Sequence, residues 1–178
     1  AREYLIRIAS SLRNGLLPNT TLDENTTNYE AADAPLWLPI AAYHFVRATG
    51  DYAFVREHLW NALQTIVRAY LHGTKYNITV DTDGLVTAGA PGTALTWMDA
   101  KTNNTIFTQR AGKAVEINAL WYNTLKIMEH FAIHFHDSNQ QYTNLATRTH
   151  DAFTTKFWNP KMQCLYDTIT PHGPDHSI

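Results

Sequence analysis

Carboxyl groups are the side chains in this sequence whose placement could support acid–base chemistry. Asp33, Asp99 and Glu116 each lie at or just before the N-terminal end of a segment expected to be an inner helix. If those ends gather on one face, carboxylates that are far apart in the chain would converge on one pocket. Asp33 also suits an N-cap and Glu116 suits a first helical turn, so each has a structural interpretation as well.

Asp99 has the most suggestive surroundings of the three. It lies in the run Thr-Trp-Met-Asp-Ala-Lys at 96–101, inside a long segment without helical periodicity. A carboxyl group beside the indole of Trp97 would keep its proton to higher pH, which a general acid acting on a sugar oxygen requires. An Asx turn is the alternative interpretation.

Aromatic side chains near these acids suggest a carbohydrate ligand. Flat rings with polar edges suit the apolar faces and hydroxyl rims of pyranose sugars, although most aromatic residues are core residues. Trp37, Trp97 and Trp121 are therefore the pocket candidates, whereas Trp60 and Trp158 lie on one-sided helices and are assigned to packing.

The sequence gives little support for a metal or a nucleotide cofactor. His130 and His134 have the i, i+4 spacing of metal ligands, with His136 nearby, but no HExxH pattern or further ligand accompanies them. No GxGxxG or GxxxxGK[ST] motif is present. Cys164, the one cysteine, is interpreted as a free structural thiol.

Composition excludes several classes of protein. The 178 residues carry a net charge of −2, and 17% are charged, so nucleic acid is not an expected partner. The apolar stretches are too short or too interrupted to span a membrane. A single cysteine excludes an internal disulfide, and with no signal peptide evident we expect a cytoplasmic protein.

Hydrophobic periodicity predicts an all-α protein with a short β-hairpin around Thr82-Asp83-Gly84. Helices are expected over residues 1–13, 36–48, 52–72, 115–136 and 140–158, with a strand pair within 162–169. The helices alternate between one apolar stripe and apolar residues nearly all round. Inner helices enclosed by outer ones predict that alternation, which favours an α/α toroid. Five helices are fewer than a ring needs, so residues 1–178 are expected to form part of one larger domain.

Long blocks of the sequence resemble a known family. The run from Gly84 to Lys101, then Thr108-Gln109-Arg110 and the block from Gly112 to Asn123, is similar to the C-terminal amylo-α-1,6-glucosidase domain of glycogen debranching enzymes. Asp33-Ala34-Pro35-Leu36-Trp37 and Leu165-Tyr166-Asp167 resemble its earlier and later segments. The resemblance covers essentially the whole chain, with departures at Gln109, where proline is usual, and at Pro35.

This resemblance implies an (α/α)6 toroid that hydrolyses α-1,6-linked glucose at glycogen branch points with inversion. Asp99 falls on the position of the proton donor, while the general base is expected beyond residue 178, with the helices that complete the ring. The remaining pocket positions are assigned to substrate binding and fall on Asp33, Trp37, Trp97, Arg110, Glu116 and Trp121. No cofactor or metal is implied, and the expected partner is an α-glucan such as glycogen or limit dextrin.

Three alternatives remain open at this point. The chain could belong to another toroid glycosidase, of the glucoamylase or trehalase type. It could be a non-catalytic α-glucan-binding module in which the acids are structural, or a helical interaction domain. An incomplete ring would expose apolar helix surface, so the isolated chain is expected to be inactive and to self-associate.

Overall fold

The computed structural model describes residues 1–19, 28–89, 92–98, 101–102, 105–108 and 110–175. Six α-helices dominate it, with a π-helical turn, η1 (Val55–Leu59), joining α3 to α4. The helices are α1 (Arg2–Ser10), α2 (Ala34–Thr49), α3 (Tyr52–Phe54), α4 (Trp60–His72), α5 (Val115–His134) and α6 (Gln140–Phe157). All five predicted helical segments are thereby confirmed, with α3, η1 and α4 together forming the segment predicted over 52–72.

Local sequence explains where the helices begin and end. Pro35 lies in the first turn of α2, where its missing N–H costs no hydrogen bond. Gly50 ends the same helix in the left-handed conformation, at φ 71°, and donates its N–H to the Val46 carbonyl. Asp51 then caps the next helical segment by accepting a hydrogen bond from the Phe54 backbone N–H.

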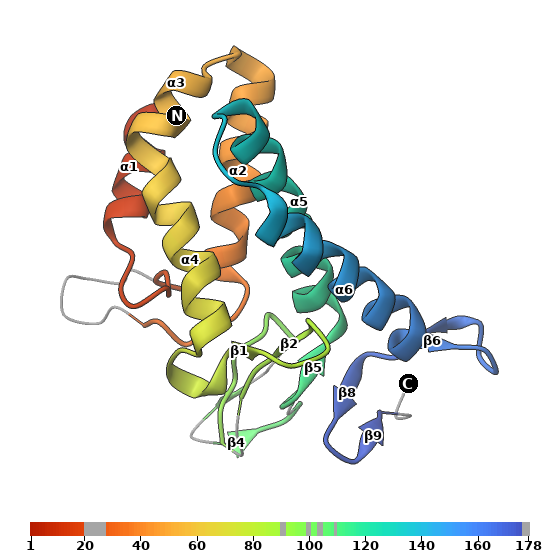
Figure 1. Ribbon diagram of the computed structural model, residues 1–178. Helices are drawn as coiled ribbons and strands as arrows, with labels where there is room; N and C mark the ends of the chain where they lie inside the picture. The colour runs from red at the N-terminus through yellow and green to blue at the C-terminus, as the bar shows by residue number, and fades with distance from the viewer. Residues whose placement is uncertain (20–27, 90–91, 99–100, 103–104, 109, 176–178) are drawn as a thin grey trace.

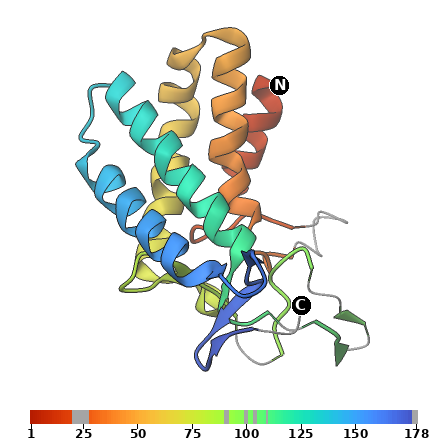
Figure 2. The same cartoon turned by 90° about the vertical axis from the view of Figure 1, so that its right-hand side faces the viewer.

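The helices are arranged so that two of them run one way and their neighbours run the other. In Figures 1 and 2, α2 and α5 lie side by side and both run upward, whereas α1, α4 and α6 run downward. The N-terminal ends of α2 and α5 therefore lie together at the lower end of the molecule. The segments that join the helices at that end carry Asp33, Trp97 and Arg110, while Trp37 and Glu116 lie in the first turns of α2 and α5.

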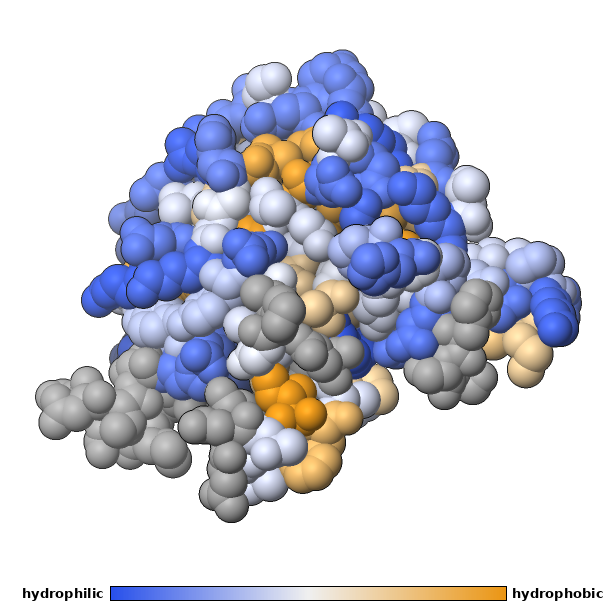
Figure 3. Space-filling model, turned by 90° about the horizontal axis from the view of Figure 1, so that it is seen from below, coloured by the Kyte–Doolittle hydropathy of each residue, from blue (hydrophilic) through white to orange (hydrophobic). Residues whose placement is uncertain are grey.

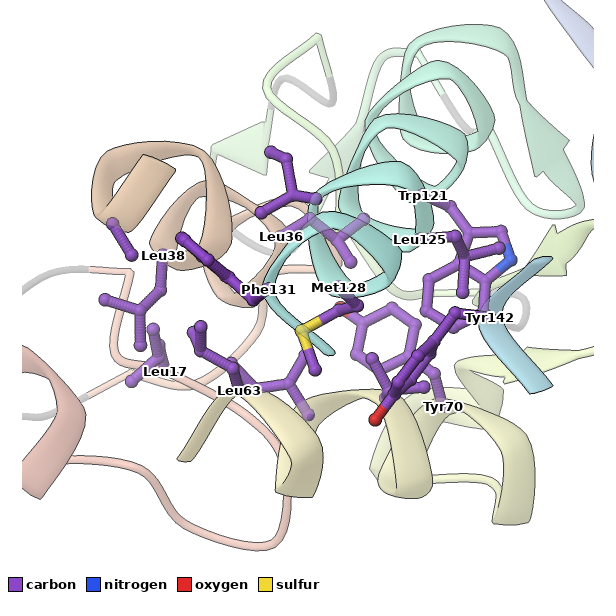
Figure 4. Close-up of a cluster of buried hydrophobic side chains, with 14 of the residues drawn as sticks. Leu17, Leu36, Leu38, Leu63, Tyr70, Trp121, Leu125, Met128, Phe131 and Tyr142 are labelled. Carbon is purple, nitrogen blue, oxygen red and sulfur yellow. The ribbon is translucent and has the colours of Figure 1, made fainter. Parts of the chain in front are cut away.

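The core lies between α2, α4, α5 and α6. Figure 4 shows Leu36 of α2, Leu63 and Tyr70 of α4, and Tyr142 of α6 around the side chains of α5. The α5 side chains in this cluster are Trp121, Leu125, Met128 and Phe131, and all of them are fully buried. Their burial fixes the rotation of α5 and, with it, the direction of the residues in its first turn.

The expectation that α2 and α5 are enclosed on all sides is wrong for this structure. Each helix keeps an exposed stripe, which includes Trp37 and His44 on α2 and Asn123, Lys126 and His130 on α5. The two helices cover each other, and their outer neighbours cover further faces, so one face of each remains in contact with solvent.

Short strands occupy the lower end. The predicted hairpin is confirmed as β1 (Thr79–Val80) paired antiparallel with β2 (Val86–Thr87). A second small hairpin joins β3 (Lys101–Thr102) to β4 (Thr105–Ile106). A three-stranded sheet has the order β5 (Lys113–Ala114), β8 (Thr168–Thr170), β9 (Gly173–Pro174).

The predicted strand pair within 162–169 is corrected by this topology. Its first strand, β7 (Cys164–Leu165), pairs with β6 (Trp158–Asn159) at the end of α6. Its second strand pairs with β5 instead, in the register Ala114↔Thr168. Because β5 leads directly into α5, this pairing attaches the C-terminal strands to the start of that helix.

Candidate functional site

The candidate site lies at the lower end of the molecule, where α2 and α5 begin. Seen from below in Figure 3, this end is mostly hydrophilic, with small hydrophobic patches. Two segments are joined there by a backbone hydrogen bond of 2.8 Å, from the Ala32 N–H to the Leu95 carbonyl. The residue that precedes Asp33 is thereby held against the segment that carries Thr96 and Trp97.

Asp33 occupies the N-cap position of α2, but its side chain makes no capping hydrogen bond to the helix. Burial raises the pKa of Asp33, and the negative charge of Glu116 raises it further. Hydrogen bonds from the backbone of Asp33 and Ala34 and from Trp37 oppose that rise without cancelling it. Asp33 and Glu116, 83 positions apart in the printed sequence, are thus close enough for the charge of Glu116 to act on Asp33.

Tyr70 contacts the residue before Asp33 from the core side. Its buried hydroxyl donates a 2.7 Å hydrogen bond to the carbonyl of Ala32, and its ring stacks on Trp121. Burial raises the pKa of Tyr70, and the charge of Asp33 adds to the effect. Tyr70 therefore stays protonated and holds the chain immediately before the carboxyl group.

Arg110 is the most connected residue of the site. Its side chain is 3% exposed and bonds two carboxylates, Glu116 in the first turn of α5 and Asp167 just before β8. Nη1 and Nη2 donate to the two Glu116 oxygens at 2.5 and 2.6 Å. Nε and Nη2 donate to the two Asp167 oxygens at 2.7 and 2.8 Å.

A hydroxyl completes the set of acceptors around this guanidinium. Nη1 also donates to Oγ1 of Thr96, at 2.9 Å. Burial alone would lower the pKa of Arg110, but the hydrogen bonds and charges of Glu116 and Asp167 outweigh it and raise the pKa. The guanidinium therefore stays charged although its side chain is shielded from solvent.

Two of the three candidate tryptophans are open to a ligand. Trp97 is 73% exposed and Trp37 is 52% exposed. Trp37 also lines a groove of about 610 Å³ between α1 and α2, together with Tyr4 and Arg7. These two rings offer the flat apolar surface that stacking on a sugar requires.

Trp121 does not fit its predicted role in substrate binding. The ring is completely buried, stacks on Tyr70 and donates its indole N–H to the Gly84 carbonyl. It has no surface that a ligand could touch, because α5 turns this position toward the core. Trp121 is a core residue that packs against Tyr70.

Comparison with known proteins now identifies the chain. The model of the family described as amylo-alpha-1,6-glucosidase matches residues 1–178. The chain belongs to this family. The resemblance seen in the sequence is therefore confirmed, and the family is one of glycosidases.

A solved structure supports the fold. The GH78 family rhamnosidase of Bacillus sp. GL1 is similar over 99% of this chain with a TM-score of 0.69, at 15% sequence identity. The chain covers 18% of that rhamnosidase. Comparison with curated protein sequences gives no match. At this identity the likeness establishes the fold and not the substrate.

Not every residue predicted for this glycosidase-family site can be placed. Asp99, the candidate proton donor, lies outside the residues that the structure describes, as does Gln109. Asp33, Trp37, Trp97, Arg110 and Glu116 are all described and lie at the lower end of the molecule. Met98, the residue before Asp99, is therefore the nearest described point to the proposed acid on its N-terminal side, and Thr96 and Trp97 precede it.

Sequence reasoning missed two contributors to the site. Asp167 and Thr96 both bond Arg110, although neither was singled out as a site residue. Asp167 lies 57 residues from Arg110, so local spacing carries no sign of the contact. The short Leu165-Tyr166-Asp167 match to the family is the one sequence feature that pointed to this segment.

Two of the three histidines, His130 and His134, contact the ring of Tyr52. Tyr52 stacks on His134 and its hydroxyl lies 3.0 Å from Nε2 of His130. In the part of the chain that the structure describes, no group of three or more His, Cys, Asp or Glu side chains is arranged to hold a metal ion. No described helix is both long and apolar enough to cross a bilayer. Cys164 is free and exposed.

Proposed function

We propose that this chain is the N-terminal part of an (α/α)6 glycosidase domain that releases glucose from α-1,6 branch points of glycogen or a related α-glucan. The observation that carries the proposal is the end-to-end match to the amylo-alpha-1,6-glucosidase family. The electrostatic effect of Glu116 on Asp33, from the neighbouring ends of two parallel helices, supports it, because carboxyl groups at such a place can bind sugar hydroxyls.

The proposed reaction is an inverting hydrolysis with Asp99 as the general acid. The Asp99 carboxyl group gives its proton to the glycosidic oxygen as the bond to the anomeric carbon breaks. A general base further along the full-length protein removes a proton from the water that attacks the opposite face of the sugar. Inversion requires the two carboxyl groups to stand roughly 6.5–9.5 Å apart, with the water between them.

The described residues supply the surroundings for this reaction. Trp37 and Trp97 offer exposed rings for stacking on glucose, and the Asp33 and Glu116 carboxyl groups can accept hydrogen bonds from its hydroxyls. The proposal invokes no cofactor and no metal. A cytoplasmic location, where glycogen-type polymers are stored and used, belongs to the same proposal.

The test is Asp99→Asn in the full-length protein, assayed on a branched limit dextrin and on linear α-1,4 glucan. We expect glucose release from branch points to fall by about 10²–10⁴-fold, with glucan binding retained. Glu57→Gln is the matched control, because this carboxylate is exposed on η1 and should leave turnover unchanged.

Each other outcome rejects a stated part of the proposal. Unchanged turnover in Asp99→Asn would remove the acid role. Faster release from the linear glucan than from branch stubs would favour a glucoamylase-type enzyme. Glucan binding by a wild-type protein that hydrolyses neither substrate would make this a binding module.

A further inference from the structure

The contacts of Arg110 account for every hydrogen that its guanidinium can donate. An arginine has five N–H groups and no acceptor. One bonds Thr96, two bond Glu116 and two bond Asp167. None remains for a sugar hydroxyl, and the side chain is 3% exposed. The assignment of Arg110 to substrate binding therefore disagrees with its geometry.

We propose that Arg110 and Asp167 are positioning residues, which set the location of the Thr96–Trp97 segment and of Glu116 for the proposed hydrolysis. The inference rests on the proposed function and deepens it. Arg110 is the junction of three segments that are separate in the chain: the segment at 95–98, the first turn of α5, and the turn before β8. Thr96 is three positions before the proposed acid.

Asp167 acts as the anchor on the opposite side of the guanidinium. Its carboxylate holds the Nε edge, and the Thr168 hydroxyl donates to the same carboxylate at 3.0 Å. Its backbone carbonyl accepts the N–H of Val115, the first residue of α5, at 2.9 Å. The backbone of Asp167 is thus fixed to the start of α5. Arg110, which bonds the Asp167 carboxylate, in turn fixes the positions of Thr96 and Glu116.

The chemistry of the contacts favours a positioning role over simple stabilisation. Buried ion pairs often contribute little net stability, because the desolvation of the charges offsets their attraction. A planar guanidinium with five directed bonds nevertheless restricts its partners to one geometry, which a lysine cannot do. The segment it restrains is also held from the other side, by the Ala32–Leu95 backbone hydrogen bond.

The first experiment measures kcat and KM of the full-length protein on limit dextrin for Arg110→Lys and Asp167→Asn. We expect kcat to fall by about 100-fold in each, while KM and the affinity for maltooligosaccharides stay within about threefold. Thr96→Val should lose kcat because it removes the hydroxyl acceptor, and Thr96→Ser should restore it.

Lys113→Met is the matched control. Lys113 is also a shielded cation bonded to two carboxylates, Asp81 and Asp83, but these belong to the β1–β2 turn and not to the site. We expect it to lower the unfolding temperature with kcat within about twofold of the wild type, because its partners lie in the β1–β2 turn and make no contact with Arg110, Thr96 or Glu116.

Hydrogen–deuterium exchange gives a second readout that does not depend on activity. In Arg110→Lys and Thr96→Val, exchange should rise in peptides covering 92–98 and at the Ala32 amide, and not in 79–87. In Lys113→Met the reverse pattern is expected.

The outcomes are distinguishable. Unchanged kcat in folded Arg110→Lys, with unchanged exchange at 92–98, would leave Arg110 as a structural residue and overturn the inference. A loss of maltooligosaccharide affinity as large as the loss of kcat would make it a substrate contact. A wild-type protein that does not hydrolyse branch points would reject the proposed function, and the exchange data would still decide whether Arg110 holds the 95–98 segment.

Discussion

At the scale of single residues, Asp33 combines a cost in stability with a place at the site. Burial and the charge of Glu116 raise the pKa of its carboxyl group. A carboxyl group whose pKa rises on folding binds its proton more tightly in the folded state, so its ionisation destabilises the protein as pH rises through the folded pKa. Such a cost is typical of groups that are retained for function.

Asp33→Asn should therefore increase the free energy of unfolding at pH 7. The asparagine has the same shape and can still accept the Trp37 hydrogen bond, but it carries no charge. The difference from the wild type should shrink as the pH falls below the ordinary aspartate value of 3.8, where both side chains are neutral. Urea unfolding at pH 7 and pH 3.5 measures it, with the exposed Asp151→Asn as a control that should show no gain.

The site residues show what residue types alone could and could not predict. Periodicity correctly indicated that Asp33 and Glu116 lie at the beginnings of helices, and the fold then makes those two helices neighbours. Trp121 was misassigned, since proximity in sequence to Glu116 does not tell which face of α5 the ring occupies. The hydrogen bonds between Arg110 and Asp167 could not be predicted from the sequence either, because they depend on the strand pairing between β5 and β8.

At the scale of elements, the β1–β2 hairpin is attached to the rest of the fold by an ion network. Lys113 of β5 bonds Asp81 and Asp83 at 2.8 and 2.6 Å, and Lys156 of α6 bonds Asp83 at 2.6 Å. Hydrogen bonding to Lys113 lowers the pKa of Asp81. Burial alone would raise the pKa of Asp83, but its bonds to Lys113 and Lys156 outweigh it and lower the pKa.

Removing the Lys113 ammonium group should make the β1–β2 hairpin less stable, and the size of the effect should depend on pH. We expect Lys113→Met to cost about 1–3 kcal/mol of unfolding free energy at pH 7, between the values for exposed and buried pairs. A lowered carboxylate pKa stabilises above the unfolded value of 3.8 and loses its contribution as pH falls through the folded pKa. The stability difference from the wild type should accordingly shrink as the pH falls from 3.8 through the lowered folded pKa values. A difference that persists once both carboxyl groups are protonated in the folded protein would contradict the electrostatic explanation.

The approach of β8 to the chain before β5 depends on a glycine. Gly112 has φ +131° and exchanges two 2.9 Å backbone hydrogen bonds with Ala88. A Cβ added there would lie 2.5 Å from the Ile169 carbonyl oxygen. Because that atom belongs to the backbone, the strand itself would have to move.

Gly112→Ala should therefore destabilise the protein by about 3 kcal/mol or more, from strain and steric overlap together. Gly50→Ala is the control: it also has positive φ, at +71°, but nothing lies within 4 Å of its added Cβ. That change should cost only about 1–2 kcal/mol. Equal midpoints for the two variants in urea would show that the contact with Ile169 has no influence.

The elements themselves were the most predictable part of the structure. Periodicity located each helix to within a few residues, since the apolar side chains of α4, α5 and α6 must face one shared core. The Asp83-Gly84 turn similarly indicated its hairpin. The partners of β6 to β9 could not be predicted, because strands of two or three residues carry too few side chains to specify a register.

At the scale of the whole molecule, one group of exposed apolar side chains lies away from the helical core. Trp158, Met162 and Leu165 cluster on the β6–β7 hairpin, with Met162 60% exposed. Figure 1 shows this hairpin extending from the end of α6, away from the other elements. A net charge of −2 provides little electrostatic repulsion between copies. The chain on its own should therefore self-associate, with the hairpin as the contact surface.

Sedimentation velocity over a range of concentrations tests this expectation. Wild-type chain should show a concentration-dependent rise in mean mass, and Met162→Ser combined with Leu165→Ser should reduce it. Ile133→Ser is the matched control: Ile133 is 58% exposed, but its neighbours on α5 are polar, so its removal should leave the association unchanged. A wild-type monomer at every concentration would contradict the prediction. An equal reduction by Ile133→Ser would assign the association to general surface hydrophobicity, because the two surfaces share nothing beyond exposed apolar atoms.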